Sequence, residues 1–511
     1  MKVTRIPQVE VLGRDSLARA WVSKEKSLES FWPFGSSMEG VVSSINQGHS
    51  LNIDRRKSVS EVIRKQYLQA GLSPPDSLTA FEQGAHSVTT GHQLQLMGGP
   101  AYFHYKILSS IRWAKQLQAK GHAAVPVFWM ASEDHDFVEI SAVHGASAES
   151  FVWNRPASAS PHCAVGRMPW TADDERGLHD WMLSQGIDSS EEAIGVDETL
   201  ATRVRRWVHD FFGDEGVLIL DGDDPTLKGL ANHLFVAEWA GEGIAPSVVS
   251  ATSALEAQGW KAQLKPQVNN VFHLSNSGER TRADRWATNQ PTDAWRSISP
   301  VEWSPNASLR PLYQEFLLES AAVVGGPGEV AYWLQLGEAF QFHGLNHPAL
   351  LMRDGGLVLS DTASELVGKL GWDPRKGWWR GPEASAAWVS SQLASESSLQ
   401  SAWKDWESAL QAYATGVGRE SLPATKGTLV QMEKELLALK KKWRKQVRLR
   451  HAGYCQALEE SFDKWITPNG LPQERQLNAL VLAQCKGGWS DWKRAWLESV
   501  AGAEEPQFLL F

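Results

Sequence analysis

Four consecutive ionisable residues follow an apolar run in the stretch VPVFWMASEDHDFVEI, residues 125–140. Glu133, Asp134, His135 and Asp136 lie where the buried strand predicted by that run would end. Because charges are costly to bury, such a group contributes little to a core, and a solvent-exposed turn is its structural alternative. As a functional group, it could hold a substrate ammonium or act as a general base. Side chains alternate along a strand, so we expect Asp134 and Asp136 to face the ligand, with His135 hydrogen-bonded beside them.

The apolar run completes a predicted βαβ unit. SVTT at residues 87–90 predicts a strand, GHQLQLMGGP at 91–100 a loop, and residues 101–121 an amphipathic helix that begins after Pro100 and ends at Gly121. In open α/β sheets, ligands bind beyond the carboxyl ends of the strands. The sequence therefore predicts an α/β fold with the four ionisable residues at a ligand site.

The loop at residues 91–100 opens a helix, so its backbone N–H groups suit an anionic phosphate or carboxylate. It lacks the Lys-Ser/Thr pair of a Walker loop, and an ordinary tight turn is the alternative. His104 could face the same site or lie in the core. The candidate binding residues of this region are Gly91, His92, Gln93, Gly99 and His104.

A second motif occupies residues 304–336 and contains the segment GGPGEVAYW. Arg310 is a candidate clamp for carboxylates, because its planar fork can bind them bidentately; alternatively, it pairs with Glu315 or Glu319 of its own helix. The glycines allow a backbone to approach a ligand closely. The other candidate binding residues are Asn306, Gly326, Gly328, Glu329 and Tyr332.

Further along the chain, the pattern changes from α/β to helical. Residues 216–225 and 349–361 predict strands, residues 269–284 a β-hairpin, and residues of about 145–210 and 240–300 insertions. Near residue 382 the pattern becomes helical. Apolar residues then follow heptad spacing in two stripes, Leu399, Trp403, Trp406, Leu410, Tyr413, Val417 and Leu429, Met432, Leu436, Leu439, Trp443. Two such stripes joined by a Gly/Pro turn predict an antiparallel coiled-coil hairpin that can pair with a second copy.

The bulk composition excludes several classes of protein. A net charge of −9 argues against a general nucleic-acid surface. No apolar run approaches the roughly 20 residues of a membrane span, and no signal-peptide block is present. The three cysteines are far apart, so neither a disulfide framework nor a cysteine zinc site is expected. These observations favour a cytoplasmic protein without membrane or nucleic-acid partners.

Three stretches together resemble a known family. They are residues 89–117 with 125–140, residues 304–336, and PNGLPQERQLNAL at 468–480. In order and spacing they resemble the cysteine-adding enzyme family of bacillithiol biosynthesis, the BshC cysteine ligases. The resemblance implies a Rossmann-like core similar to class I aminoacyl-tRNA synthetases, with two connecting insertions and a coiled coil that forms a homodimer. His92 is a departure, because a glutamine is expected there and Gln93 follows it.

The resemblance implies a division into a catalytic core (1–380), a coiled-coil dimerisation hairpin (381–465) and a C-terminal segment (466–511) that packs back on both. It also implies ligation of cysteine to glucosaminyl-malate, the last step of bacillithiol biosynthesis. The cysteine carboxylate must be activated and the amine must be unprotonated. ATP or ADP is the candidate nucleotide ligand, and no metal is expected.

Two alternatives remain. One is a metal-dependent hydrolase acting on an amino sugar through His92, Asp134, His135 and Asp136. The other is a non-catalytic dimeric scaffold.

Overall fold

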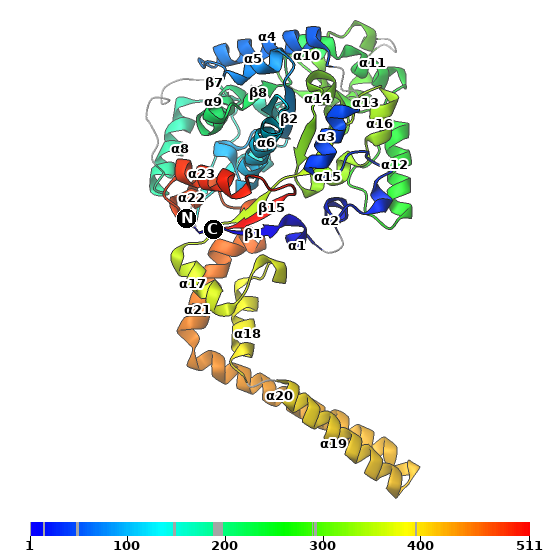
Figure 1. The fold of residues 1–511 in the computed structure, drawn as a ribbon, viewed down its shortest axis with the longest axis vertical. Helices are drawn as coiled ribbons and strands as arrows, with labels where there is room; N and C mark the ends of the chain where they lie inside the picture. The colour runs from blue at the N-terminus through cyan, green and yellow to red at the C-terminus, as the bar shows by residue number, and fades with distance from the viewer. Residues whose placement is uncertain are drawn as a thin grey trace. The chain divides into compact units, whose positions relative to one another are not determined.

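The computed structural model describes residues 2–13, 16–47, 51–146, 150–187, 198–288, 290, 294–393 and 396–511 (Figure 1). The chain folds into two compact units. Unit 1 comprises Met1–Val358 and Glu474–Phe511, and unit 2 comprises Leu359–Gln473.

Unit 1 is built on a five-stranded sheet in which every neighbouring pair of strands is parallel. Across the sheet the strands are β8 (Leu218–Asp221), β3 (Ala124–Met130), β2 (His86–His92), β12 (Ala322–Gly325) and β13 (Ala349–Met352). Numbered along the chain, this order is 3-2-1-4-5, the order of a Rossmann fold. The predicted Rossmann-like α/β core is therefore confirmed.

The predicted βαβ unit is present as β2, α6 (Ala101–Ala119) and β3. All seven residues of β3 are buried, as expected for a parallel strand covered on both faces. Helix α6 packs against both strands. Strand β2 is longer than the predicted SVTT, because its pairing with β3 continues to Gly91 and His92. These two residues thus belong to the strand end and not to the following loop.

The other predicted strands are also found. Residues 216–225 contain β8, and residues 349–361 contain β13 and β14 (Gly355–Leu357). The predicted hairpin is β9 (Val271–Leu274) with β10 (Arg280–Arg282), and β11 (Trp303–Pro305) joins it. The predicted insertions include residues 147–149, 188–197, 289 and 291–293, which lie outside the described residues.

Helices and short strands complete unit 1 around the sheet. The elements before the second motif are α2 (Leu17–Val22), α3 (Met38–Asn46), α4 (Ile53–Gln69), α5 (Ser77–Glu82), α7 (Phe137–Ile140), β4 (Ala142–His144), β5 (Ser150–Val152), α8 (Ala172–Ser184), α9 (Leu200–Phe212), α10 (Pro225–Leu230), α11 (Asn232–Ala240) and α12 (Ala245–Ala257). Those that follow are α14 (Arg310–Leu318), α15 (Pro327–Trp333), α16 (Gly337–Phe342), α22 (Ala479–Gln484) and α23 (Trp489–Val500).

The C-terminal strand closes unit 1. Strand β15 (Gln507–Leu510) lies between β1 (Thr4–Pro7) and β14 in a second sheet. A fully buried ion pair fixes it, since the Asp354 carboxylate binds Arg112 of α6 at 2.7 Å and also accepts the Gln507 N–H at 2.7 Å. Residues far apart in the sequence therefore hold the end of β13 in one position.

Unit 2 is helical. It contains α17 (Asp361–Leu370), α18 (Gly381–Ser391), α19 (Glu396–Val417), α20 (Leu422–Arg450) and α21 (Ala452–Ser461). Helices α19 and α20 lie side by side as the predicted coiled-coil hairpin (Figure 1). The boundary predicted at residue 380 falls inside this unit, because α17 and α18 both pack on α21. Across the described parts of both units, we find no helix with the length and apolar character that crossing a bilayer requires.

The buried strand β3 gives the first prediction. Phe128 is 1% exposed, so Phe128→Ala should lower the free energy of unfolding by roughly 3–5 kcal/mol through lost contacts and a residual cavity. Val249, which is 49% exposed, provides the control, and Val249→Ala should change stability by less than about 0.5 kcal/mol. Denaturant titration measures both. Equal effects of the two substitutions would show that β3 is not at the centre of the core.

Candidate functional site

A pocket opens where the chain leaves the sheet in two opposite directions. The chain runs from β2 through α6 to β3 on one side, and from β12 through α15 to β13 on the other. Rossmann-like folds bind ligands at this switch point. The pocket has a volume of about 630 Å³, within the usual range for small-molecule sites. Of the binding residues predicted from the sequence, those that line the pocket are Gly91, His92, Gln93, Arg310, Gly326, Gly328, Glu329 and Tyr332.

An ion pair between a buried lysine and a partly buried glutamate spans the floor of this switch point. Lys106 of α6 binds Glu329 of α15 with 2.7 Å between Nζ and Oε2, and also donates to the Gly91 carbonyl. Glu329 in turn accepts the Gly326 N–H at 2.8 Å. Although burial alone would raise the pKa of Glu329, Lys106 and this N–H hold it below its usual value. The pair therefore connects the carboxyl ends of β2 and β12.

Arg310 lies at the first turn of α14 and faces the pocket. Its predicted alternative role, an ion pair within the helix, is wrong. Glu315 accepts hydrogen bonds from Gln314 and Ser320, and Glu319 pairs with Arg55 instead. Burial lowers the pKa of Arg310, but Tyr332 beside the guanidinium and then Asp134 raise it above its usual value.

A second arginine lines the pocket from the segment that follows unit 2. Arg475 is preceded by Glu474, which binds Arg353 bidentately at 2.6 and 3.0 Å. Among the residues that the structure describes, neither Arg310 nor Arg475 has a carboxylate within ion-pair distance. The pocket thus offers two guanidinium groups to an anion.

His92 ends β2 and packs against Tyr102, with 5.3 Å between the ring centroids. Its Nδ1 lies 3.2 Å from the Gln93 carbonyl. Burial and then the Lys106 ammonium lower the pKa of His92 to about 3. The imidazole is therefore neutral at physiological pH, and a neutral hydrogen-bonding group takes the place of the glutamine expected there.

Asp134 contacts the pocket through Gln93. Residues 131–136 form a turn after β3, so the strand alternation assumed for them does not apply. The Gln93 amide donates to Asp134 Oδ2 at 3.0 Å, and the N–H groups of His135 and Asp136 donate to Oδ1. Burial raises the pKa of Asp134, but Arg310 and Arg280 outweigh it, so the pKa lies below its usual value. Asp134 is held as a carboxylate anion.

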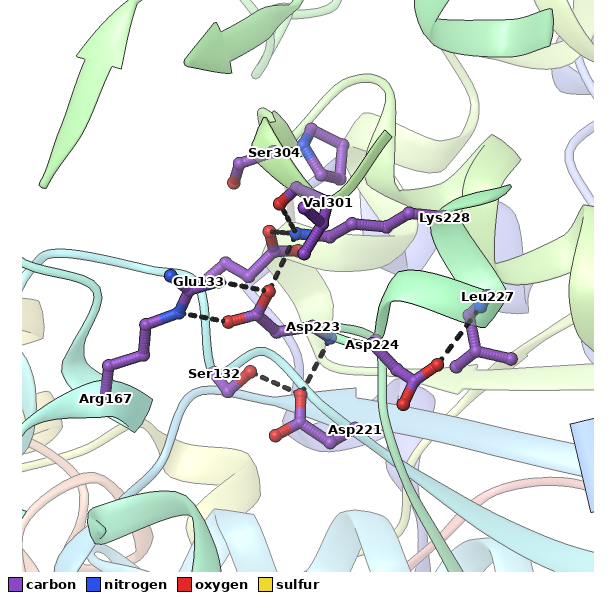
Figure 2. A network of polar contacts seen from close by, with 12 residues as sticks. Ser132, Glu133, Arg167, Asp221, Asp223, Asp224, Leu227, Lys228, Val301 and Ser304 are labelled. Carbon is purple, nitrogen blue, oxygen red and sulfur yellow. Dashed lines mark hydrogen bonds and ion pairs between the residues drawn. The ribbon is translucent and has the colours of Figure 1, made fainter. Parts of the chain in front are cut away.

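Glu133 points into a separate polar network (Figure 2). Its Oε1 lies 2.6 Å from Lys228 Nζ, and Lys228 also pairs with Asp223 at 2.7 Å. Arg167 binds the same Asp223, with 2.7 Å between Nε and Oδ2. The Lys228 side chain is fully buried, and Glu133 does not line the pocket. Glu133 therefore belongs to a structural ion pair that fixes the turn after β3.

His135 and Asp136 also have contacts away from the pocket. His135 Nδ1 lies 3.3 Å from a guanidinium nitrogen of Arg280. Asp136 is exposed and caps α7 by accepting the Glu139 N–H at 3.3 Å. The structure therefore separates the four ionisable residues: Asp134 accepts a hydrogen bond from the side chain of Gln93, and Asp136 accepts one from the backbone of Glu139, and both of these donors line the pocket.

Three further sequence candidates lie elsewhere. The Gly99 carbonyl accepts the Asn478 amide at 2.8 Å, and the neighbouring Ala101 N–H bonds to the Leu477 carbonyl, so residues 477–478 occupy the start of α6. His104 is buried against Phe211, Phe212 and Trp489. Asn306 Oδ1 accepts the N–H groups of Ser308 and Leu309 just before α14, and its amide donates to Asn270 at 2.9 Å.

Several residues that line the pocket were not predicted. They are Tyr102, Lys106, Trp129, Glu139, Gln314, Arg353 and Glu474. All of these except Arg353 lie within the stretches that carry the family resemblance, as does Arg475, which also lines the pocket. Glu139 and Glu474 follow a strand end or a glycine turn, where polar residues can mark a site. Lys106 shows no such signal, because its helix is amphipathic and the residue resembles any surface lysine.

The ligands of a metal-dependent hydrolase are not assembled. Among the described residues, no group of three or more His, Cys, Asp and Glu side chains is placed to hold a metal ion. His92, Asp134, His135 and Asp136 have separate partners, so the geometry gives this alternative no ligand set.

Comparison with known proteins defines the family. Residues 1–354 match the family model for the BshC N-terminal Rossmann-like domain of bacillithiol biosynthesis, and residues 357–488 match its C-terminal coiled-coil domain. The chain belongs to the BshC family. This confirms the resemblance drawn from the three sequence stretches.

Three curated relatives carry the name "Putative cysteine ligase BshC". The relative from Cytophaga hutchinsonii is 29% identical over 486 residues, 89% of each chain. The one from Flavobacterium psychrophilum is 29% identical over 377 residues, 68% of this chain and 69% of the relative. The one from Salinibacter ruber is 32% identical over 341 residues, 59% of this chain and 58% of the relative.

The neutral His92 of this BshC family member gives the second prediction. Unfolded histidine has a pKa near 6.5, so between roughly pH 6.5 and 3 the unfolded chain binds one more proton at His92 than the folded chain. Acidification through this window therefore destabilises the wild type. The His92→Gln variant lacks this titrating group and therefore does not lose stability through it. Across this window, the unfolding free energy of the variant minus that of the wild type should increase by up to about 1.4 kcal/mol for each unit by which the pH falls. Urea titrations at several pH values measure it; parallel pH profiles of the two proteins would contradict a depressed pKa.

Proposed function

We propose that this chain is the ligase that joins cysteine to glucosaminyl-malate in bacillithiol biosynthesis. Membership of the BshC family and the names of the relatives support this assignment. The observation that carries it is the composition of the pocket at the switch point. Two guanidinium groups without carboxylate partners share this pocket with carboxylates, and the acceptor substrate combines two carboxylates with an amine.

Arg310 and Arg475 are the proposed ligands of the malate carboxylates. Guanidinium groups bind carboxylates through two parallel hydrogen bonds, which lysine cannot reproduce. Arg310 is fixed by the first turn of α14, and the other cationic side chains of the pocket, Lys106 and Arg353, are already paired with Glu329 and Glu474. The unpaired arginines are therefore the groups available to a substrate anion.

The reaction requires activation of the cysteine carboxylate. Amide formation from a carboxylate is unfavourable in water, and adenylylation by ATP with AMP as the later leaving group overcomes this. The adenylate must be protected from water. The pocket is lined by the aromatic side chains of Tyr332, Trp333 and Trp129 in addition to its polar groups, which limits the contact of a bound adenylate with water.

Thiol profiling of cells tests the proposal. Cells that lack the protein should contain no bacillithiol and should accumulate glucosaminyl-malate. The wild-type gene should restore the thiol, whereas Arg310→Ala should not, because the acceptor loses a carboxylate ligand. Arg176→Ala is the matched control, since Arg176 is exposed on α8, lies outside the pocket lining and pairs with Asp173 at the surface.

Normal bacillithiol without accumulated glucosaminyl-malate in the deficient cells would refute the ligase assignment. Restoration by Arg310→Ala at wild-type protein levels would instead support the scaffold alternative, in which the pocket has no chemical role.

We also propose that the hairpin of α19 and α20 forms a homodimer. Its heptad stripes are only partly covered within one hairpin: Leu429 is buried, but Met432, Leu439 and Trp443 are 40%, 41% and 38% exposed. On α19, Tyr413 is 77% exposed. A second copy would cover this apolar surface.

Charged substitutions in the stripe test the dimer. Replacing Leu436 and Leu439 with Glu should give a monomer in sedimentation, because charge would be buried at the interface. Thr428→Glu with Ala438→Glu adds the same charge away from the stripe and should leave the dimer intact. A wild-type monomer, or a dimer unaffected by the leucine changes, would exclude this interface.

A further inference from the structure

Glu139 is a pocket carboxylate whose backbone is firmly held. It lies in α7, which is anchored by the buried side chains of Phe137 and Ile140 and capped by Asp136. The Glu139 side chain itself is accessible and lines the pocket. A fixed backbone with an accessible carboxylate suits a group that must reach a substrate atom reproducibly.

One amide group links Glu139 to Asp134. The Gln93 amide donates to Asp134 Oδ2 at 3.0 Å and is also hydrogen-bonded to Glu139. A primary amide has two N–H donors, so it can serve both carboxylates at once. Gln93 at the end of β2 therefore interacts with both carboxylates.

The surroundings of the two carboxylates differ. Asp134 has Arg310 and Arg280 near it and accepts two backbone N–H groups, which keep its pKa low despite burial. Burial raises the pKa of Glu139, and Asp136 and Asp134 raise it further against the effects of Gln93 and Arg310. Two neighbouring carboxylates with pKa values shifted in opposite directions are a recurring acid–base arrangement.

Tyr102 of α6 also interacts with Glu139. Burial and then Glu139 raise the pKa of Tyr102 to about 12, so its hydroxyl keeps its proton. Tyr102 can therefore donate to a carboxylate but does not compete with Glu139 for a proton at neutral pH.

We infer that Glu139 is the general base of the ligation, and that Asp134 orients the substrate ammonium group beside it. This inference rests on the proposed function. The Glu139 carboxylate takes one proton from the ammonium, and the electrons of the broken N–H bond stay on nitrogen as its lone pair. That lone pair forms the C–N bond to the activated cysteine carbonyl, the C–O bond to AMP breaks, and AMP leaves with those electrons. The second nitrogen proton passes to water as the amide forms.

The other candidate bases are less suited. Glu133 is paired with the buried Lys228 and lies outside the pocket lining (Figure 2). Burial and then the nearby Arg280 lower the pKa of His135, which makes it a weaker base. His92 lines the pocket, but its pKa of about 3 makes it a weak base.

Glu139→Gln separates the two halves of the reaction. Purified full-length protein is supplied with ATP, cysteine and glucosaminyl-malate, and cysteine activation is followed by exchange of labelled pyrophosphate into ATP. The variant should retain this exchange and lose amide formation by roughly 10²–10⁴-fold, the usual contribution of a general base. Its residual rate should rise about tenfold per pH unit below the pKa of the amine, because only the free amine reacts.

Two further variants sharpen the test. Glu139→Asp keeps the carboxylate and should recover part of the rate. Glu256→Gln, on the exposed surface of α12, is the matched control and should behave as wild type. Melting temperatures of all variants verify folding.

The outcomes distinguish this inference from the proposed function. Amide formation by Glu139→Gln at the wild-type rate would overturn the role of Glu139 and leave the ligase assignment intact. Equal loss of exchange and amide formation would also overturn it, because Glu139 would then act before the transfer. A wild-type protein that forms no amide under these conditions would overturn the ligase assignment, and the inference with it.

Discussion

The ion pair between Lys106 and Glu329 determines the geometry of the switch point. Each partner belongs to the helix that follows one of the two diverging strands, and each also binds backbone at a strand end, Gly91 or Gly326. A buried pair of this kind contributes little net stability, because desolvation offsets the attraction. Its effect is positional: neither strand end can move without leaving a charge unpaired. The floor of the pocket is therefore held together by this pair, and Arg310 is positioned beside it by the first turn of α14.

A second group of buried charges fixes the neighbouring strand. Lys228 binds Glu133 and Asp223, and Arg167 binds Asp223 as well, so the turns after β3 and β8 are held together (Figure 2). This network draws Glu133 away from the pocket, and the next residue, Asp134, is thereby directed toward Gln93. Adjacent carboxylates of the same turn thus have different roles because one of them is neutralised by lysine.

The fold could be predicted from the sequence because its signals are local. The apolar run of β3, the helix of α6 and the heptads of α19 and α20 each occupy one continuous stretch. Part of the site also has a local signal in the sequence, because Arg310 and Glu329 lie in one motif with its glycines. What could not be predicted depends on distant partners. Glu474 pairs with Arg353, and Lys228 pairs with Glu133 and keeps it away from the pocket. Residues 477–478 are hydrogen-bonded to the backbone at the start of α6. The alternation assumed for residues 133–136 failed because β3 ends at Met130 and a turn follows.

Arg310 acts electrostatically on both carboxylates of the proposed acid–base pair, Asp134 and Glu139. It lowers the pKa of both Asp134 and Glu139, and no carboxylate among the described residues pairs with it directly. A substrate carboxylate bound to Arg310 would offset this positive charge. The pKa of Glu139 would then rise further, while Asp134 would still be held by Arg280, Gln93 and its backbone hydrogen bonds. Binding of the acid end of the acceptor would therefore make Glu139 a stronger base for the amine end and would favour proton removal from the bound acceptor.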